Sequence, residues 1–328
     1  MSESTSASPA DPRQDEPEPI RAVPLRHPGR WISGALVLIA LGLFAWGAAT
    51  NEAYRWDVYF QYLFDRRITA AAWKTIQLTV LAMLFAVLLG VLLAVMRLSP
   101  NPVLRSVAWL YLWVFRGTPV YVQLVLWGLF PSIYKQIDIG IPFVHQFVHI
   151  DVQGINAAFL FAVIGLALNE AAYMAEIVRA GISSVPEGQI EASTALGMSW
   201  SQTIRRTVLP QAMRVIIPPT GNELISMLKT TSLVAAVPYS LELYGRARDI
   251  SGANFQPIPL LLVAATWYLA ITSVLMIGQF YLERYFSKGV SRQLTARQLQ
   301  ALADAQNTPV AGLTLDTPKP GAPGEDAR

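Results

Sequence analysis

Residues 75–96, TIQLTVLAMLFAVLLGVLLAVM, form a long stretch without a charged side chain. About 20 predominantly apolar residues in a helix suffice to cross the ~30 Å hydrocarbon core of a bilayer. The stretch therefore predicts a transmembrane helix over about residues 73–96, and it places the chain among membrane proteins.

Composition extends this prediction to the rest of the chain. The chain is 53% apolar and only 14% charged, whereas soluble proteins carry about 25% charged residues. Hydropathy is lower where Arg116-Gly117-Thr118-Pro119 interrupts one span and where Glu223 and Lys229 lie in another. We expect an all-α, polytopic membrane helical bundle with six spans at about 31–50, 73–96, 104–130, 156–179, 216–240 and 259–283.

Lysine and arginine predict the orientation of the spans. The segments 1–30, 97–106, 179–214 and 284–328 hold 16 of these residues, and the segments on the opposite side hold 6. Basic residues are enriched in cytoplasmic segments. We therefore expect a multi-pass protein of the cytoplasmic membrane with both termini in the cytoplasm.

The two ends of the chain are polar and differ from the spans. Residues 1–30 lack an apolar segment, so they predict a disordered cytoplasmic tail and no signal peptide. Residues 288–328 predict a second, mostly disordered tail, with a short surface helix within 289–306. Cysteine is absent, which excludes disulfides and thiolate chemistry. No P-loop is present, so the chain itself carries no nucleotide site.

Residues 183–210, SSVPEGQIEASTALGMSWSQTIRRTVLP, form the most informative predicted cytoplasmic loop. Ser184 and Glu187 have the spacing of a capping box at the start of a short helix, and Ser199 and Gln202 repeat it. Gly197 suits a helix end in the left-handed conformation. We expect two short helices, the second running to Val208 and limited by Pro210.

The first of these helices is too short to be stable alone. It either lies on the protein's own cytoplasmic face or is presented to a soluble partner, to which it would transmit motion by rigid-body contact. We favour the partner.

The same loop resembles the EAA loop of bacterial ABC importer permeases. That signature is EAA, three residues, Gly, nine residues, Ile, one residue, Leu-Pro. Here Ser193 replaces the second Ala and Thr207 replaces the Ile, whereas the remaining positions match. A second tripeptide, Glu170-Ala171-Ala172, lacks the downstream spacing, and we regard it as a coincidence. The resemblance implies that the loop 181–214 docks on an ATPase through Gln189, Glu191, Ala192, Ala195, Leu196, Gly197, Leu209 and Pro210.

The resemblance covers about residues 70–287 and is specific to the polar amino-acid branch, the histidine/glutamine-type permeases. Stretches such as FRGTPVYVQL (115–124) carry it. It implies a type I ABC importer permease fold with five core spans, and here 31–50 is an extra N-terminal span. It also implies a separate ATPase that binds the ATP, a second permease subunit and an extracytoplasmic solute-binding protein. The amino acid carried, the choice between homodimer and heterodimer, and the roles of 31–50 and of the long loop 131–155 remain open.

Polar residues within the spans predict the substrate pathway. Such residues are costly in hydrocarbon and normally face the bundle interior. Asn222, Ser226 and Lys229 share one face of the fifth span. Arg116 or Lys229 could meet a carboxylate, and Glu176 or Glu223 an ammonium group. Alternatively, these residues pair with each other and only hold helices together. The predicted pathway residues are Arg116, Gly117, Thr118, Pro119, Glu176, Asn222, Glu223, Ser226, Lys229, Thr230 and Ser232.

Pro119 breaks the third span, which is tolerated at membrane depth where the backbone lines a cavity or is buried in protein. An ordinary proline kink is the alternative. His145 and His149 have a spacing that could hold a metal, but only Asp151 is near, so we expect no metal site.

Two alternative functions are a secondary transporter and a membrane enzyme. A secondary transporter would need internal repeats and paired broken helices, and only one broken helix is evident. A membrane enzyme would need a catalytic cluster that the sequence does not supply.

Overall fold

The computed structural model describes residues 28–141, 145–152 and 155–286. The terminal helix predicted within 289–306 lies outside these residues, as do most of both tails. The described chain is a helical membrane bundle, so the predicted fold class is confirmed.

The first half of the bundle starts with α1 (Pro28–Thr50), the 3-10 turn η1 (Glu52–Tyr54) and α2 (Trp56–Leu63). The long helix α3 (Arg66–Leu98) follows, and then α4 (Pro102–Gly117) and α5 (Val120–Ile133). An antiparallel hairpin of β1 (Gln136–Ile141) and β2 (His145–Asp151) occupies the loop 131–155. The two histidines considered as metal ligands therefore lie on a strand.

The second half contains α6 (Ile155–Ser183), α7 (Glu187–Ala195), α8 (Trp200–Thr203), the π-helical segment η2 (Ile204–Val208) and α9 (Leu209–Thr230). The 3-10 segment η3 (Thr231–Ala236), α10 (Leu243–Asn254) and α11 (Pro257–Phe286) complete it. Within the described residues, four helices are long and apolar enough to cross a membrane: Gly29–Thr50, Arg66–Leu98, Ala157–Ser183 and Pro257–Phe286. The third and fifth expected spans correspond to α4 with α5 and to α9, and the fifth begins at Leu209, earlier than expected.

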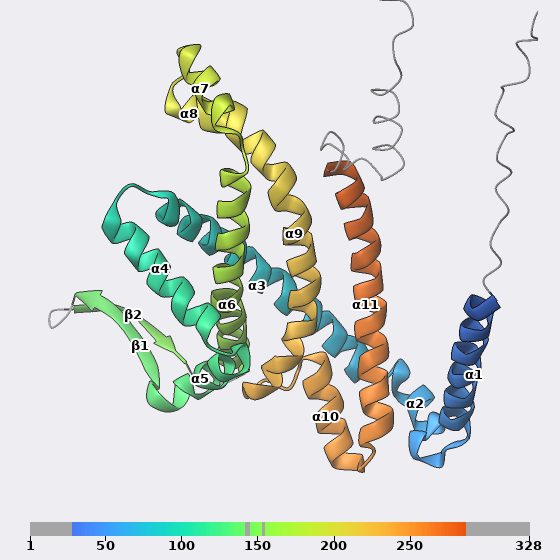
Figure 1. Cartoon of the computed structure of the whole chain (residues 1–328). Coiled ribbons are helices and arrows are strands. Elements are labelled where there is room, and N and C mark those ends of the chain that lie inside the picture. Colours follow the sequence, from blue (N-terminus) through green and yellow to red (C-terminus); the bar gives the residue numbers. More distant parts are fainter. Residues whose placement is uncertain (1–27, 142–144, 153–154, 287–328) are drawn as a thin grey trace, which may run out of the picture.

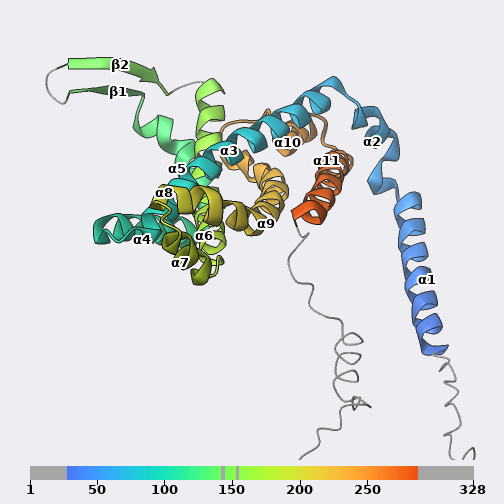
Figure 2. The same ribbon diagram turned by 90° about the horizontal axis from the view of Figure 1, so that it is seen from above.

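The main helices form a row that α3 covers on one side. Figure 1 shows α4, α6, α9 and α11 side by side with α3 crossing behind them, and Figure 2 shows α3 along the same side from above. Helix α3 contacts α4, α6 and α9. The opposite side of α4, α6 and α9 therefore remains open in a single chain.

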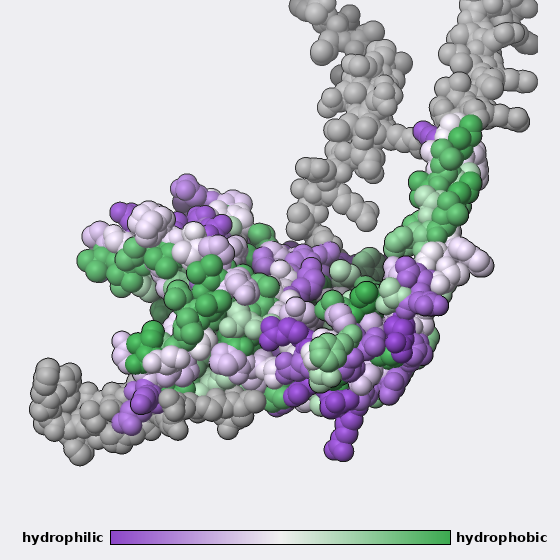
Figure 3. Space-filling model, turned by 90° about the horizontal axis from the view of Figure 1, so that it is seen from below, coloured by the Kyte–Doolittle hydropathy of each residue, from purple (hydrophilic) through white to green (hydrophobic). Residues whose placement is uncertain are grey.

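Helix α1 stands apart from this row (Figures 1 and 2). None of its membrane-spanning window is buried in the protein. In the space-filling view it is hydrophobic along its length, whereas hydrophilic side chains gather on part of the face opposite α7 and α8 (Figure 3). A helix that is apolar all round and unburied suits contact with lipid.

Candidate functional site

The loop between α6 and α9 projects from one end of the bundle (Figure 1). Gly197 ends α7 with φ of +74°, and the expected capping box of Ser199 and Gln202 is present. The expected box of Ser184 and Glu187 is absent. Pro186 is the N-cap residue of α7, and the Ser184 hydroxyl instead donates to the Gly181 carbonyl at the end of α6.

The helix does not stop before Pro210, contrary to expectation. The π-helical turn η2 leads directly into α9, and the Leu209 N–H donates to the Ile204 carbonyl. Pro210 lies in the first turn of α9, where a missing N–H does no harm. The loop is therefore joined to α9 by continuous helical backbone.

The predicted ATPase-contacting residues are exposed on this loop. Leu196 is 82% exposed and the neighbouring Trp200 is 79% exposed, although both are large and apolar. Helix α7 contacts η2 and α8, so it does not lie flat on the rest of the protein. The remaining predicted contact residues are also exposed: Gln189, Glu191, Ala192, Ala195, Gly197, Leu209 and Pro210.

Ser193 and Thr207, the two residues that differ from the EAA signature, contact each other. The hydroxyl groups of Ser193 and Thr207 are 2.8 Å apart and form a hydrogen bond between α7 and η2. Ser193 is buried, at 5% exposure. The pair fixes α7 against the segment that leads into α9.

The predicted polar face of α9 is exposed in the single chain. Asn222, Ser226 and Lys229 are all exposed, and Asn222 donates to Glu283 of α11 at 3.3 Å. Thr230 and Ser232 follow at the end of α9 and in η3, where both hydroxyls donate to backbone carbonyls.

The break at Gly117-Thr118-Pro119 separates two helices and is more than a kink. Gln123 of α5 donates to the Phe115 carbonyl at 3.0 Å and to the Thr118 hydroxyl at 2.7 Å. Asn169 of α6 donates to the same Phe115 carbonyl at 3.0 Å. Buried side chains thus satisfy backbone groups freed by the break, as the hydrocarbon region requires. Gln123 lies in the FRGTPVYVQL stretch but is not among the predicted site residues.

Arg116 and Glu176 come together, with two further arginines. The Glu176 carboxylate is 2.8 Å from Arg179, 3.5 Å from Arg97 and 4.0 Å from Arg116. Arg116 also lies over the Tyr173 ring, 5.4 Å from its centroid. Arg97, Arg116, Tyr173 and Glu176 line a cavity of about 480 Å³ between α3, α4 and α6. Two guanidinium groups and one carboxylate line it, so the cavity is positively charged.

An acidic pair lies on the other side of α6. Glu170 is only 8% exposed, and its carboxyl group interacts electrostatically with that of Glu223 on α9. Its Oε1 atom is buried without a hydrogen-bond partner among the described residues. Within the same ranges, neither carboxyl group has an ion pair with a basic side chain. Burial of an unpaired polar atom is costly, so this pair is a candidate site for a cation. Glu170 is not among the predicted pathway residues, because its EAA tripeptide was interpreted as a coincidence.

Comparisons with known proteins agree with the motif. The family "Binding-protein-dependent transport system inner membrane component" matches residues 86–288. The arginine transport system permease protein ArgU of Corynebacterium glutamicum is 63% identical over 301 residues, which is 92% of this chain and 93% of that protein. The histidine/lysine/arginine/ornithine transport system permease protein HisM of Salmonella typhimurium is 39% identical over 207 residues, 62% of this chain and 82% of that one.

A solved structure, described as an amino acid ABC transporter with histidines, superimposes with a TM-score of 0.57 at 32% identity. The match covers 71% of this chain and 98% of that one. The resemblance drawn from the EAA-type loop is confirmed.

Proposed function

Because this chain belongs to the family of inner-membrane components of binding-protein-dependent transport systems, we propose that it is the permease subunit that conducts a basic amino acid, with arginine as the leading candidate. It is an amino-acid permease of an ATP-binding-cassette importer, and it works with an ATPase subunit, a second permease subunit and an extracytoplasmic binding protein. This membership favours a permease subunit over the secondary transporter and the membrane enzyme.

One observation carries the choice of a basic cargo: the buried Glu170 carboxyl group and the half-buried Glu223 carboxyl group beside it have no basic partner among the described residues. A cationic side chain of the cargo would supply the missing charge. The similarity to an arginine permease over 92% of the chain supports the same choice.

The arginine cluster around Glu176 is suited to the other end of the cargo. Its excess positive charge fits a carboxylate, and guanidinium groups bind carboxylates with favourable geometry. Glu170 and Glu176 lie on different sides of α6, six residues or about 9 Å of axial rise apart, so the two sites would contact the cargo at successive stages of its passage.

The remaining predicted pathway residues would form the polar wall along which the cargo moves, with Asn222, Ser226 and Lys229 on the exposed face of α9. Arg116 and Glu176 also pair with each other, so they serve both as structure and as pathway.

ATP would be bound and hydrolysed on the separate ATPase, and the exposed residues of α7 and η2 would transmit its motion. Such motion would switch the paired permeases between outward-facing and inward-facing states. The side that carries α7 and α8 would be cytoplasmic. The excess of lysine and arginine in the predicted cytoplasmic segments supports this orientation.

Cargo binding to the purified complex, measured without binding protein, tests the proposal. Glu170→Gln should weaken arginine binding about tenfold or more, because the guanidinium loses its charged partner. Binding of citrulline, the uncharged analogue of arginine, should be weak in the unaltered complex and change little in the variant.

Glu52→Gln removes an exposed carboxylate from η1 and serves as the matched control. If Glu170→Gln left arginine affinity unaltered, or if the unaltered complex bound citrulline as tightly as arginine, the assignment of a basic cargo to this acidic pair would fail.

A further inference from the structure

A second basic cavity lies at the opposite end of the bundle from α7 and α8. It has a volume of about 400 Å³ and lies between the first turns of α3 and the start of α10. Ala70, Ala71 and Leu241 form its apolar wall, and its four charged lining residues are Arg66, Arg67, Lys74 and Arg246. It shares no lining residue with the cavity around Glu176.

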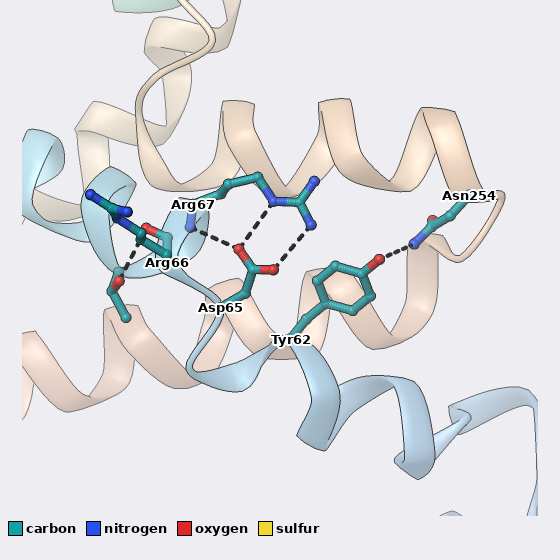
Figure 4. Close-up of polar contacts among 6 residues, drawn as sticks. Tyr62, Asp65, Arg66, Arg67 and Asn254 are labelled. Atoms are coloured by element: carbon teal, nitrogen blue, oxygen red, sulfur yellow. Dashed lines mark hydrogen bonds and ion pairs between the residues drawn. The ribbon is translucent and has the colours of Figure 1, made fainter.

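Only one of the four cations is neutralised. Asp65 caps α3 by accepting from the Arg67 backbone at 2.7 Å, and it holds the Arg67 guanidinium at 3.0 and 3.1 Å. Figure 4 shows this closed pair, with the Arg66 side chain directed away from it. Because the Asp65 carboxylate is engaged by Arg67, it does not neutralise the other three basic side chains.

Arg66, Lys74 and Arg246 have no ion pair with a carboxylate among the described residues. Lys74 instead lies over the Phe159 ring, 5.9 Å from its centroid. Glu242, one helical turn before Arg246, is fully buried. Its oxygens accept from Thr75, Tyr244 and Gly245, and it also contacts the Tyr268 hydroxyl. The three unpaired cations give the cavity a positive charge.

The walls of the cavity are held in place. Glu242 caps α10 and connects it to Thr75 of α3 and Tyr268 of α11. Tyr62 of α2 accepts from Asn254 at the other end of α10 at 3.4 Å (Figure 4). Side chains that are already held in place lose little conformational entropy when a ligand binds between them.

The location of this positively charged cavity indicates which molecule would bind there. In the proposed orientation this cavity faces the extracytoplasmic side, on which lysine and arginine are scarce. Transport in this family depends on a binding protein, which must dock on that side. We infer that this cavity receives an acidic side chain of the extracytoplasmic solute-binding protein and helps to align that protein over the pathway. The inference rests on the proposed orientation, and not on the identity of the cargo.

Docking affinity tests the inference. The experiment uses the assembled transporter in lipid nanodiscs, titrated with the purified binding protein loaded with cargo. Arg246→Glu and Lys74→Glu should each raise the Kd for the binding protein about tenfold. Affinity should fall with added salt in the unaltered complex, and it should fall less steeply in these variants.

Two variants act as controls. Arg246→Lys keeps the charge and should retain most of the affinity, which excludes a folding defect at this position. Arg248→Glu changes an exposed arginine of the same helix that does not line the cavity, and it should leave the Kd unchanged.

Two results would overturn the inference. One is equal affinity of the unaltered complex and Arg246→Glu at low salt. The other is a defect that appears in nanodiscs containing anionic lipid and vanishes in neutral lipid, which would assign the cavity to a lipid phosphate. Because the readout is docking and not cargo affinity, neither result bears on Glu170.

Discussion

At the scale of single residues, Gly90 decides how closely α3 and α6 approach. A Cβ atom at this position would lie 3.1 Å from the Ala175 nitrogen and 3.2 Å from the Ala171 carbonyl oxygen, and it would collide with the Met174 Cβ atom. Ala171 and Ala172 are fully buried at this contact. Small residues that allow close backbone approach are a common means of holding membrane helices together.

Gly90→Ala should therefore destabilise the complex. The surrounding atoms are backbone or Cβ atoms that cannot rotate away, so we expect a loss of about 1–3 kcal/mol. Gly278→Ala on α11 is the control, since no atom lies within 4 Å of its added Cβ. Thermal unfolding of the detergent-solubilised complex measures both. Equal melting temperatures for the two variants would contradict the assigned role of Gly90.

At the scale of elements, α7, η2 and α9 form one mechanical unit. The π-helical turn lets the chain pass Pro210 without ending the helix, and the hydrogen bond between Ser193 and Thr207 holds α7 to that turn. Motion applied to α7 would therefore reach α9, which carries the polar face of the proposed pathway.

The bond between Ser193 and Thr207 can be measured by a double-mutant cycle. Ser193→Ala and Thr207→Ile should each destabilise the loop by about 0.5–1.5 kcal/mol, because each leaves a hydroxyl without its partner. The double variant restores the family's residues at both positions and should recover much of the loss.

ATP hydrolysis stimulated by the binding protein, together with thermal stability, provides the readout for this cycle. Thr194→Ala is the control, because the Thr194 hydroxyl bonds only within α7. Strictly additive effects of the two substitutions would show that the two side chains are not coupled.

At the scale of the whole molecule, the described chain has one covered side and one open side. Helix α3 covers the row of α4, α6 and α9 on one side and leaves the other side uncovered (Figures 1 and 2). A single chain exposes Asn222, Ser226 and Lys229. A second permease subunit that packed against this chain would enclose these side chains, so that each chain would form half of the pathway.

The absence of cysteine from the sequence permits a direct test of orientation. Ser201→Cys on α8 and Ala253→Cys at the end of α10 each introduce one exposed thiol at opposite ends of the bundle. A membrane-impermeant maleimide applied to spheroplasts should label the thiol at position 253 at once. It should label the thiol at position 201 only after permeabilisation, and the reverse pattern would refute the proposed orientation.

Features that depend on local chemistry could be predicted from the amino-acid sequence. The length of the apolar stretches predicted the spans, because hydropathy is a property of neighbouring residues. The spacing of residues within the loop predicted the family, because that motif lies in one short segment. Even so, Ser184 and Pro210 were misjudged, since their geometry depends on how α6 and α9 continue on either side of the loop.

Which distant residues meet depends on how the helices pack. Glu170 faces Glu223 across two helices, Arg97 of α3 and Arg116 of α4 approach Glu176 of α6, and Arg246 joins the cavity at the start of α3. Spacing along the chain fixes the face of a helix on which a residue lies. The crossing of one helix over another fixes what that face contacts, and it is set by close packing at positions such as Gly90.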